Sequence, residues 1–493
     1  MNYIKYIFFG ATLLLASSCG NDWLDIEPSN KVQTETSLKT LKELNFTLNG
    51  IYSKMQSSDG YTGRIIYYGD VTADDMQANG EGKRTSNYYF YKYNKTNAPS
   101  TFWRIPYEII RNTNIILTKI DAIPLGDGSE ENEAYMKEVK GQALALRALA
   151  LFDLTRFYGV PYAKDQGKSW GAAIVKDVTG IDSKPKRNTV AECYTEIISD
   201  LKDAVKLLTT KHNPGKINRW GAMTLLSRVY LYKGDKDGNT AALTTAIEAI
   251  EGAKKAGYSL WTNEQYADAW ADDSPVRANE VFFEIVNLTV DGPGKESISY
   301  LCNVKGYYDM FPTSSFMTML QSDKKDVRNK LFVRAKKSSK YYYFCNKYQP
   351  AADESISDAN IPIVRMSELY LNAAEAAVKL NDNDNAVFYL EAIVNRANPD
   401  KHVTGTVTLE QVLTERRKEF VGEGHRLFDA MRNNQTIERK DIPLSNAENK
   451  HGTLTDEAKK FDWNFYKIIL PIPKFEMDTN PNMADQQNPG YGD

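Results

Sequence analysis

The sequence predicts a mostly α-helical protein, a tetratricopeptide-like superhelix of helical hairpins that carries irregular loop and short-strand insertions. Two helix–turn–helix units, at 220–256 and 367–397, alternate small and large apolar residues in the manner of such hairpins. An alanine-rich segment at 141–162 is apolar around most of its circumference, as expected of a central helix. Between the two hairpin units, residues 258–361 lose helical periodicity and contain strand-like runs.

The composition is that of an ordinary globular protein, and its charge gives no argument for nucleic-acid binding. The chain has 493 residues, 42% hydrophobic and 25% charged, with a net charge of −3. The unusual count is 30 tyrosines. Tyrosine combines a flat apolar face with a hydroxyl, which suits polar ligands with apolar faces, although most tyrosines are expected to be structural.

The N-terminus has the layout of a secretory signal. Lys5 precedes a short apolar run at 6–15, and the small residues Ala16-Ser17-Ser18 lead directly into Cys19. This arrangement looks like a bacterial lipobox. We expect residues 1–18 to be a lipoprotein signal peptide, Cys19 to be lipidated and 19–34 to be a tether; the alternative is an ordinary signal peptide followed by an incidental cysteine.

The remaining residues, 35–493, are expected to form one body. Amphipathic helices are predicted at 36–56, 101–120 and 191–208. The runs 64–70 and 88–93 are β-like and flank a polar loop. The predicted parts are an N-terminal helical part at 35–257 with a loop at 64–100, a mixed insertion at 258–361, and a C-terminal helical hairpin with an irregular tail at 362–493.

Arg147 is the exception in the apolar first half of the central helix. An unpaired buried guanidinium costs several kcal/mol, roughly, so we expect a carboxylate or helix-end carbonyls beside it. Cys193, Cys302 and Cys345 are too few and too scattered for a disulfide framework, and at most one pair could form.

The helix predicted at 409–432 carries a cluster of carboxylates that allows a catalytic interpretation. Glu415, Glu419 and Glu423 share one helical face, and glycoside hydrolysis requires two carboxylates. Arginines surround them, however, which favours structural ion pairs over a general acid. The four histidines have no metal-ligand spacing, and no phosphate-binding glycine motif follows a strand. We therefore expect no enzyme, no cofactor and no metal.

Six segments carry a resemblance to a known family. The chain resembles the SusD/RagB outer-membrane lipoproteins of the Bacteroidetes from end to end and in the family's order. The segments are Cys19-Gly20-Asn21-Asp22-Trp23-Leu24-Asp25 with Pro28, FWRIPYEIIRNTN, LALRALALFDLTRFYGVPY, IPIVRMSELYLNAAEA, ERRKEFVGEGHRLFDAMR and LPIPKFEMDTNPNMADQQNPGY.

The resemblance implies a cell-surface protein, anchored by lipid to the outer membrane, that captures nutrients without catalysis. Such proteins deliver their cargo, commonly oligosaccharides, to a SusC-like TonB-dependent transporter. A version that binds peptides or another nutrient would keep every scaffold motif, and a protein-interaction repeat would instead use its concave helical face. A glycan-active enzyme is the remote alternative.

Two loop segments are predicted to line the ligand site. Saccharide sites pair aromatic faces with hydrogen-bonding side chains on reachable loops, and the segments 74–91 and 300–308 meet that description. The family resemblance points to the same regions. The alternative is that these tyrosines only cover the scaffold. The candidates are Asp74, Gln77, Asn79, Arg84, Tyr89, Tyr300, Asn303, Tyr307 and Tyr308.

Overall fold

The computed structural model describes residues 38–180, 182–213, 215–337 and 339–492. The predicted signal peptide, Cys19 and the tether lie outside the described residues. The helices are α2 (Leu41–Met55), α3 (Arg64–Val71), α4 (Ser86–Tyr89), α5 (Thr101–Lys119), α6 (Glu130–Tyr158), α7 (Tyr162–Asp165), α8 (Val190–Leu207), α9 (Arg219–Lys233), α10 (Lys236–Lys255), α11 (Ile298–Cys302), α12 (Ser314–Gln321), α13 (Met366–Lys379), α14 (Asn383–Ala397), α15 (Leu409–Phe420), α16 (Arg426–Arg432), α17 (Asp456–Lys459) and α18 (Lys474–Thr479). The strands are β1 (Met76–Ala78), β2 (Val281–Ile285), β3 (Met310–Pro312), β4 (Phe332–Lys337), β5 (Lys340–Cys345), β6 (Ile361–Arg365), β7 (Ile437–Glu438) and β8 (Lys460–Phe461).

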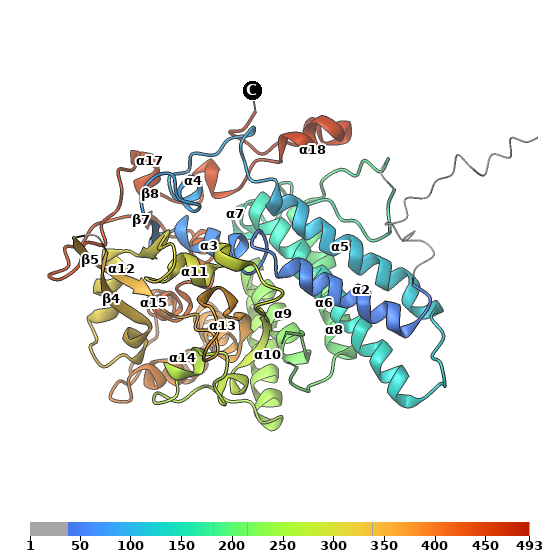
Figure 1. Cartoon of the computed structure of the whole chain (residues 1–493), viewed down its shortest axis with the longest axis horizontal. Coiled ribbons are helices and arrows are strands. Elements are labelled where there is room, and N and C mark those ends of the chain that lie inside the picture. Colours follow the sequence, from blue (N-terminus) through green and yellow to red (C-terminus); the bar gives the residue numbers. More distant parts are fainter. Residues whose placement is uncertain (1–37, 181, 214, 338, 493) are drawn as a thin grey trace, which may run out of the picture.

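The body is a continuous array of antiparallel helices, which confirms the predicted fold class. Helices α5, α6, α8, α9 and α10 pack in sequence order, each on the next. Helix α10 then packs against α13, which contacts both α14 and α15. The second predicted hairpin therefore stacks directly on the first, although the insertion separates them in sequence. In Figure 1 the long helices α2, α5, α6 and α8 lie on the right, and strands β4 and β5 of the insertion lie on the left.

The central helix α6 is longer than predicted and begins at Glu130, where Ser129 caps its N-terminus. It ends at Gly159, which has an extended backbone with φ −112°. A Cβ at Gly159 would lie 2.7 Å from Val190 Cγ2, so the glycine permits close approach to the start of α8. Within α6, Arg147 donates to both oxygens of Asp200 on α8 at 2.7 Å, which confirms the expected carboxylate partner.

The two β-like runs near the N-terminus are helical, so that prediction was wrong. Residues 64–70 form most of α3, and 88–93 contain the end of α4 and the turn that follows it. Seven of the eight residues of α3 are buried, which gives a short, almost continuous apolar run. Such a run has no periodicity that separates a buried strand from a buried helix.

Short antiparallel strand pairs hold the insertion and the tail. Strand β2 pairs with β6, and β4 and β5 form a hairpin, which confirms the two predicted strands of the insertion. Strand β6 leads directly into α13 and so returns the chain to the helical array. Strands β7 and β8 pair within the C-terminal tail. Across the described ranges, the structure has no helix with the length and apolar character that a membrane span needs.

Candidate functional site

The two predicted ligand segments meet through a strand pair. Strand β1 pairs antiparallel with β3, with Met76 opposite Pro312 and Ala78 opposite Met310. Beyond the strands, the backbone N–H of Asn79 donates to the carbonyl of Asp309 at 2.8 Å. This ladder places the chain from Asn79 onward beside the segment that ends at Tyr308. It also explains how residues more than 200 positions apart can form one surface.

Three half-buried tyrosines and two cations form a patch where these segments meet. We define the tyrosine patch as Lys83, Arg84, Tyr300, Tyr307 and Tyr308. The rings of Tyr300 and Tyr307 contact edge to face, with centroids 5.0 Å apart. The Arg84 guanidinium lies 4.1 Å from the centroid of the Tyr307 ring. Ring faces beside hydrogen-bonding groups are suited to ligands that have both apolar and polar surfaces.

Tyr308 occupies an unusual backbone conformation at the centre of this surface. Its φ is 41°, in the left-handed region that a bulky residue rarely adopts. Its ring contacts Phe344 of β5, with centroids 6.3 Å apart, so the hairpin supports it from one side. Left-handed non-glycine residues persist where surrounding contacts enforce them, and they cluster at functional sites.

Two carboxylates fix the guanidinium of Arg84. Its Nε donates to Glu296 at 2.6 Å, and its Nη1 donates to Asp309 at 3.1 Å. The hydrogen bonds that Arg84 donates to Glu296 raise the pKa of Arg84 above its ordinary value. The guanidinium therefore stays charged and is held over Tyr307 in one orientation.

Asp74 and Gln77 do not face solvent, so their predicted exposure was wrong. The Asp74 carboxylate accepts hydrogen bonds from Arg426 at 2.7 Å and from Arg417 at 3.4 Å. Burial alone would raise the pKa of Asp74, but these two guanidiniums hold it well below its ordinary value. Gln77 is fully buried and donates to the carbonyl of Asn449 at 3.0 Å.

Tyr89 and Asn303 are buried as well, which corrects the same prediction for them. The Tyr89 hydroxyl lies 2.5 Å from His451 Nδ1. Asn303 donates to the side chain of Asn346 at 2.9 Å. These side chains join the two loops to the rest of the body. Asn79 is half-buried at the edge of the tyrosine patch.

Several neighbours of the patch were missed by sequence reasoning. Lys83 and Asp309 each lie beside a predicted residue in the chain, so adjacency could have pointed to them. Lys295 lies in the 3₁₀ segment Gly294–Glu296 and Lys337 lies on β4, and no local pattern indicates that they reach the tyrosines. The Lys337 ammonium lies 4.5 Å from the centroid of the Tyr308 ring.

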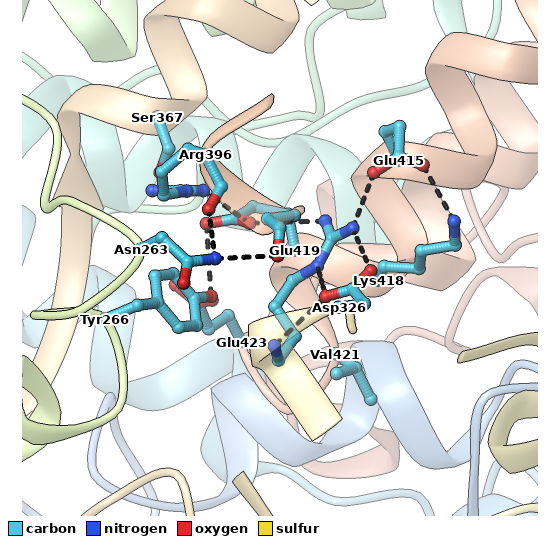
Figure 2. Close-up of polar contacts among 12 residues, drawn as sticks. Asn263, Tyr266, Asp326, Ser367, Arg396, Glu415, Lys418, Glu419, Val421 and Glu423 are labelled. Carbon is cyan, nitrogen blue, oxygen red and sulfur yellow. Dashed lines mark hydrogen bonds and ion pairs between the residues drawn. The ribbon is translucent and has the colours of Figure 1, made fainter. Parts of the chain in front are cut away.

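The glutamates considered as catalytic residues form an ion-pair network, but they do not share one helical face as predicted, because α15 ends at Phe420 and Glu423 lies in the turn before α16. Glu419 accepts from Arg365 at 2.5 Å and contacts Arg396 at 2.7 Å and Arg328 at 3.5 Å. Figure 2 shows Tyr266, Arg396 and Asp326 gathered around Glu419. Arg365 ends β6, Arg396 lies on α14, and Arg328 lies in the 3₁₀ segment Val327–Leu331. The carboxylate of Glu419 thus joins its own helix, α15, to three other segments.

The protonation of these glutamates argues against acid catalysis. Burial by itself would raise the pKa of Glu419, but Arg396, Arg365 and Arg328 hold it far below its ordinary value. The pKa values of Glu415 and Glu423 are also lowered by neighbouring cations, against the opposing effect of burial. A general acid in glycoside hydrolysis needs a raised pKa instead.

Comparisons with known proteins agree with the resemblance in the sequence. A model of the SusD family matches residues 318–491, and a second model, described as starch-binding and associating with the outer membrane, matches 22–231. The structure of a SusD superfamily protein from Bacteroides vulgatus ATCC 8482 is 36% identical, with a TM-score of 0.83, and the match covers 92% of this chain and 100% of that one. The chain belongs to the SusD family.

Two other relatives extend this SusD-family assignment. A candidate sugar-binding protein from Bacteroides vulgatus ATCC 8482 is 56% identical, with a TM-score of 0.87, over 93% of this chain and all of that one. SusD-like protein P38 of Formosa agariphila is 24% identical over 84% of this chain and 88% of its own length. Both similarities run through most of each chain.

Replacement of Glu419 by glutamine tests the role of the network in this SusD-family fold. Glu419→Gln should lower the free energy of unfolding by about 3–5 kcal/mol at neutral pH, because buried guanidiniums would lose their counter-charge. Glu410→Gln, at an exposed position in the first turn of the same helix, should change it by less than about 0.5 kcal/mol. Guanidinium chloride titrations of both variants measure the difference.

The difference in unfolding free energy between the wild type and Glu419→Gln should also depend on pH. The folded pKa of Glu419 lies below the ordinary value of 4.5, so the carboxylate stabilises the fold fully above pH 4.5 and less as the pH falls. The gap between the wild type and Glu419→Gln should therefore narrow in acid. Equal stabilities at neutral pH would show that the network does not hold the segments together.

Proposed function

We propose that this SusD-family protein is a cell-surface lipoprotein that binds oligosaccharides at the tyrosine patch and passes them to a SusC-like TonB-dependent transporter. The observation that carries the proposal is the assembly of Tyr300, Tyr307 and Tyr308 beside Arg84 on one accessible surface. The starch-binding description of one family model and the sugar-binding description of the 56% identical relative support the choice of saccharides.

A sugar ring has patches of C–H groups on its faces and hydroxyls around its rim. Tyrosine faces can bind the apolar patches, while neighbouring side chains hydrogen-bond to the hydroxyls. The edge-to-face arrangement of Tyr300 and Tyr307 places two rings at a steep angle, 78° between planes. Such a surface can contact more than one sugar unit of a chain.

We infer binding without catalysis. The carboxylates of Glu415 and Glu419 on α15, and of Glu423 in the turn after it, bind neighbouring cations, and their lowered pKa values leave them without a proton to donate at neutral pH. They also lie in the buried network rather than in the tyrosine patch. Incubation with the bound oligosaccharide should therefore leave its chain length unchanged in chromatography, and release of shorter products would overturn this inference.

Loss of the tyrosine rings should weaken binding. Tyr307→Ala and Tyr308→Ala should each cost about 1–2 kcal/mol of binding free energy, because each removes a ring face that the ligand would cover. Tyr341→Ala is a matched control: its ring also carries a cation, Arg334, 3.7 Å from the centroid. Phe344 of β5 contacts Tyr308. Side chains alternate between the two faces along a strand, so Tyr341, three positions before Phe344, points to the opposite face of the hairpin.

Calorimetry against a panel of neutral and charged oligosaccharides and short peptides measures these affinities, and thermal unfolding checks that the variants stay folded. Unchanged affinity in the Tyr307/Tyr308 double variant would place the ligand elsewhere. Binding of peptides alone would support the peptide-binding alternative of the same family.

We propose lipid attachment at Cys19, because the short apolar run ends in small residues directly before it. The mature protein should begin at Cys19 and carry fatty acyl groups. Intact-mass measurement of the membrane-extracted protein tests this, with Cys19→Ala as the control that should lack acylation and leave the membrane fraction. A mature chain that begins at another residue would contradict the assignment.

Delivery to a transporter requires a partner, because a binding protein on the surface cannot move its cargo across the membrane. Gentle detergent extraction from the native host, followed by affinity capture of this protein, should recover a large β-barrel protein in near-equal amount. The same capture after high-detergent washing serves as the control for nonspecific membrane contaminants. Repeated recovery of this protein alone under the gentle conditions would refute the delivery model.

A further inference from the structure

The tyrosine patch carries more positive than negative charge. The Lys83 and Lys337 ammonium groups lie 5.1 and 4.5 Å from the centroid of the Tyr308 ring. Lys295 lies 5.9 Å from the ring of Tyr300 in the same way. Together with Arg84, four cations therefore contact the three tyrosine rings.

The nearby carboxylates, Glu296 and Asp309, pair with only two of these four cations. Glu296 and Asp309 both bind Arg84, at 2.6 and 3.1 Å. Asp309 also approaches Lys83, but only to 3.7 Å. Within the described residues, neither Lys295 nor Lys337 has an ion pair, so two of the four positive charges stay without a carboxylate partner. The whole chain, in contrast, has a net charge of −3.

The β4–β5 hairpin adds to this imbalance. Lys337 stands directly opposite Lys340 in the strand register, and like charges in that position repel. Lys340 has a partner, Glu448, 3.8 Å away, whereas Lys337 points its ammonium toward Tyr308. Lys83 and Lys337 both lie against the Tyr308 ring, so an anion bound beside that ring would be attracted by two positive charges.

We propose that the tyrosine patch selects anionic oligosaccharides, whose sugar rings carry carboxylate or sulfate groups, over neutral ones. This inference rests on the proposed function of the patch. The tyrosine faces would contact the sugar rings, and Lys83 and Lys337 would donate charge-assisted hydrogen bonds to the anionic groups beside Tyr308. Arg84 is already bound to two carboxylates and holds Tyr307 in place.

Titration of the full-length mature protein with four probes tests the selectivity. The probes are oligogalacturonides, which carry carboxylates, chondroitin sulfate oligosaccharides, which carry carboxylates and sulfates, a desulfated form of the latter, and neutral maltooligosaccharides. At low salt an anionic probe should bind at least about tenfold more tightly than the neutral one. This preference should largely vanish at about 1 M sodium chloride, where the Debye length falls to about 3 Å.

Removal of single lysine charges tests whether the preference for anionic probes comes from the patch or from the charge of the protein as a whole. Lys83→Gln and Lys337→Gln should each weaken the anionic probe about threefold to fivefold, since exposed ion pairs contribute up to about 1 kcal/mol, and should leave the neutral probe unchanged. Lys254→Gln is the matched control, because Lys254 also lies over a tyrosine, 5.6 Å from the ring of Tyr370, on the distant α10–α13 pair.

The possible outcomes distinguish the two proposals. If neutral oligosaccharides bind as tightly as anionic ones, or if the lysine variants weaken both equally, the anionic preference is overturned while binding at the tyrosines stands. If no probe responds to Tyr307→Ala and Tyr308→Ala, both proposals are overturned. Comparison of the sulfated and desulfated probes shows whether sulfate or carboxylate is the group bound.

Discussion

The buried carboxylate of Glu419 is the constraint on which this fold depends. A carboxylate in the interior is stable only with partners, and here Arg365, Arg396 and Tyr266 contact it from three separate segments. Arg365 and Arg396 in turn both bind Glu280, which lies just before β2. None of these groups can leave without exposing a buried charge. The insertion and the C-terminal helices are therefore held together by charge as well as by apolar packing.

Ion pairs from α15 and α16 also hold the segment that leads to the proposed binding surface. Arg417 of α15 binds Asp75, and Arg426 of α16 binds Asp74, immediately before β1. Strand β1 then pairs with β3, whose preceding residues are the half-buried Tyr308 at the surface and the buried Asp309 that binds Arg84. Asp74 is predicted from the sequence as a ligand contact, but its carboxylate is buried and binds Arg426 and Arg417. Through Arg426 and Arg417, Asp74 anchors the start of the strand that positions the residues of the proposed binding surface.

Local patterns in the sequence predicted the long helices because some, such as α5 and α8, have one apolar face, and others, such as α6, contain long alanine-rich apolar runs. The partner of Arg147 could be anticipated as a carboxylate for a physical reason, although its identity as Asp200 depends on the packing of α6 on α8. The candidate site was predicted at the level of segments. The exposure of single residues could not be predicted from the sequence, because Gln77 and Tyr89 are buried against Asn449 and His451 from the distant C-terminal tail.

The contrast between the interior and the surface bears on the chemistry of the ligand. In the network around Glu419, each guanidinium has carboxylate partners within hydrogen-bonding distance, so the charges cancel where water is excluded. At the tyrosine patch, Lys295 and Lys337 stay in contact with solvent and with ring faces, without carboxylates. An uncompensated charge is tolerated there because water screens it. A bound ligand would displace that water, and the cost of doing so falls if the ligand brings the missing negative charge.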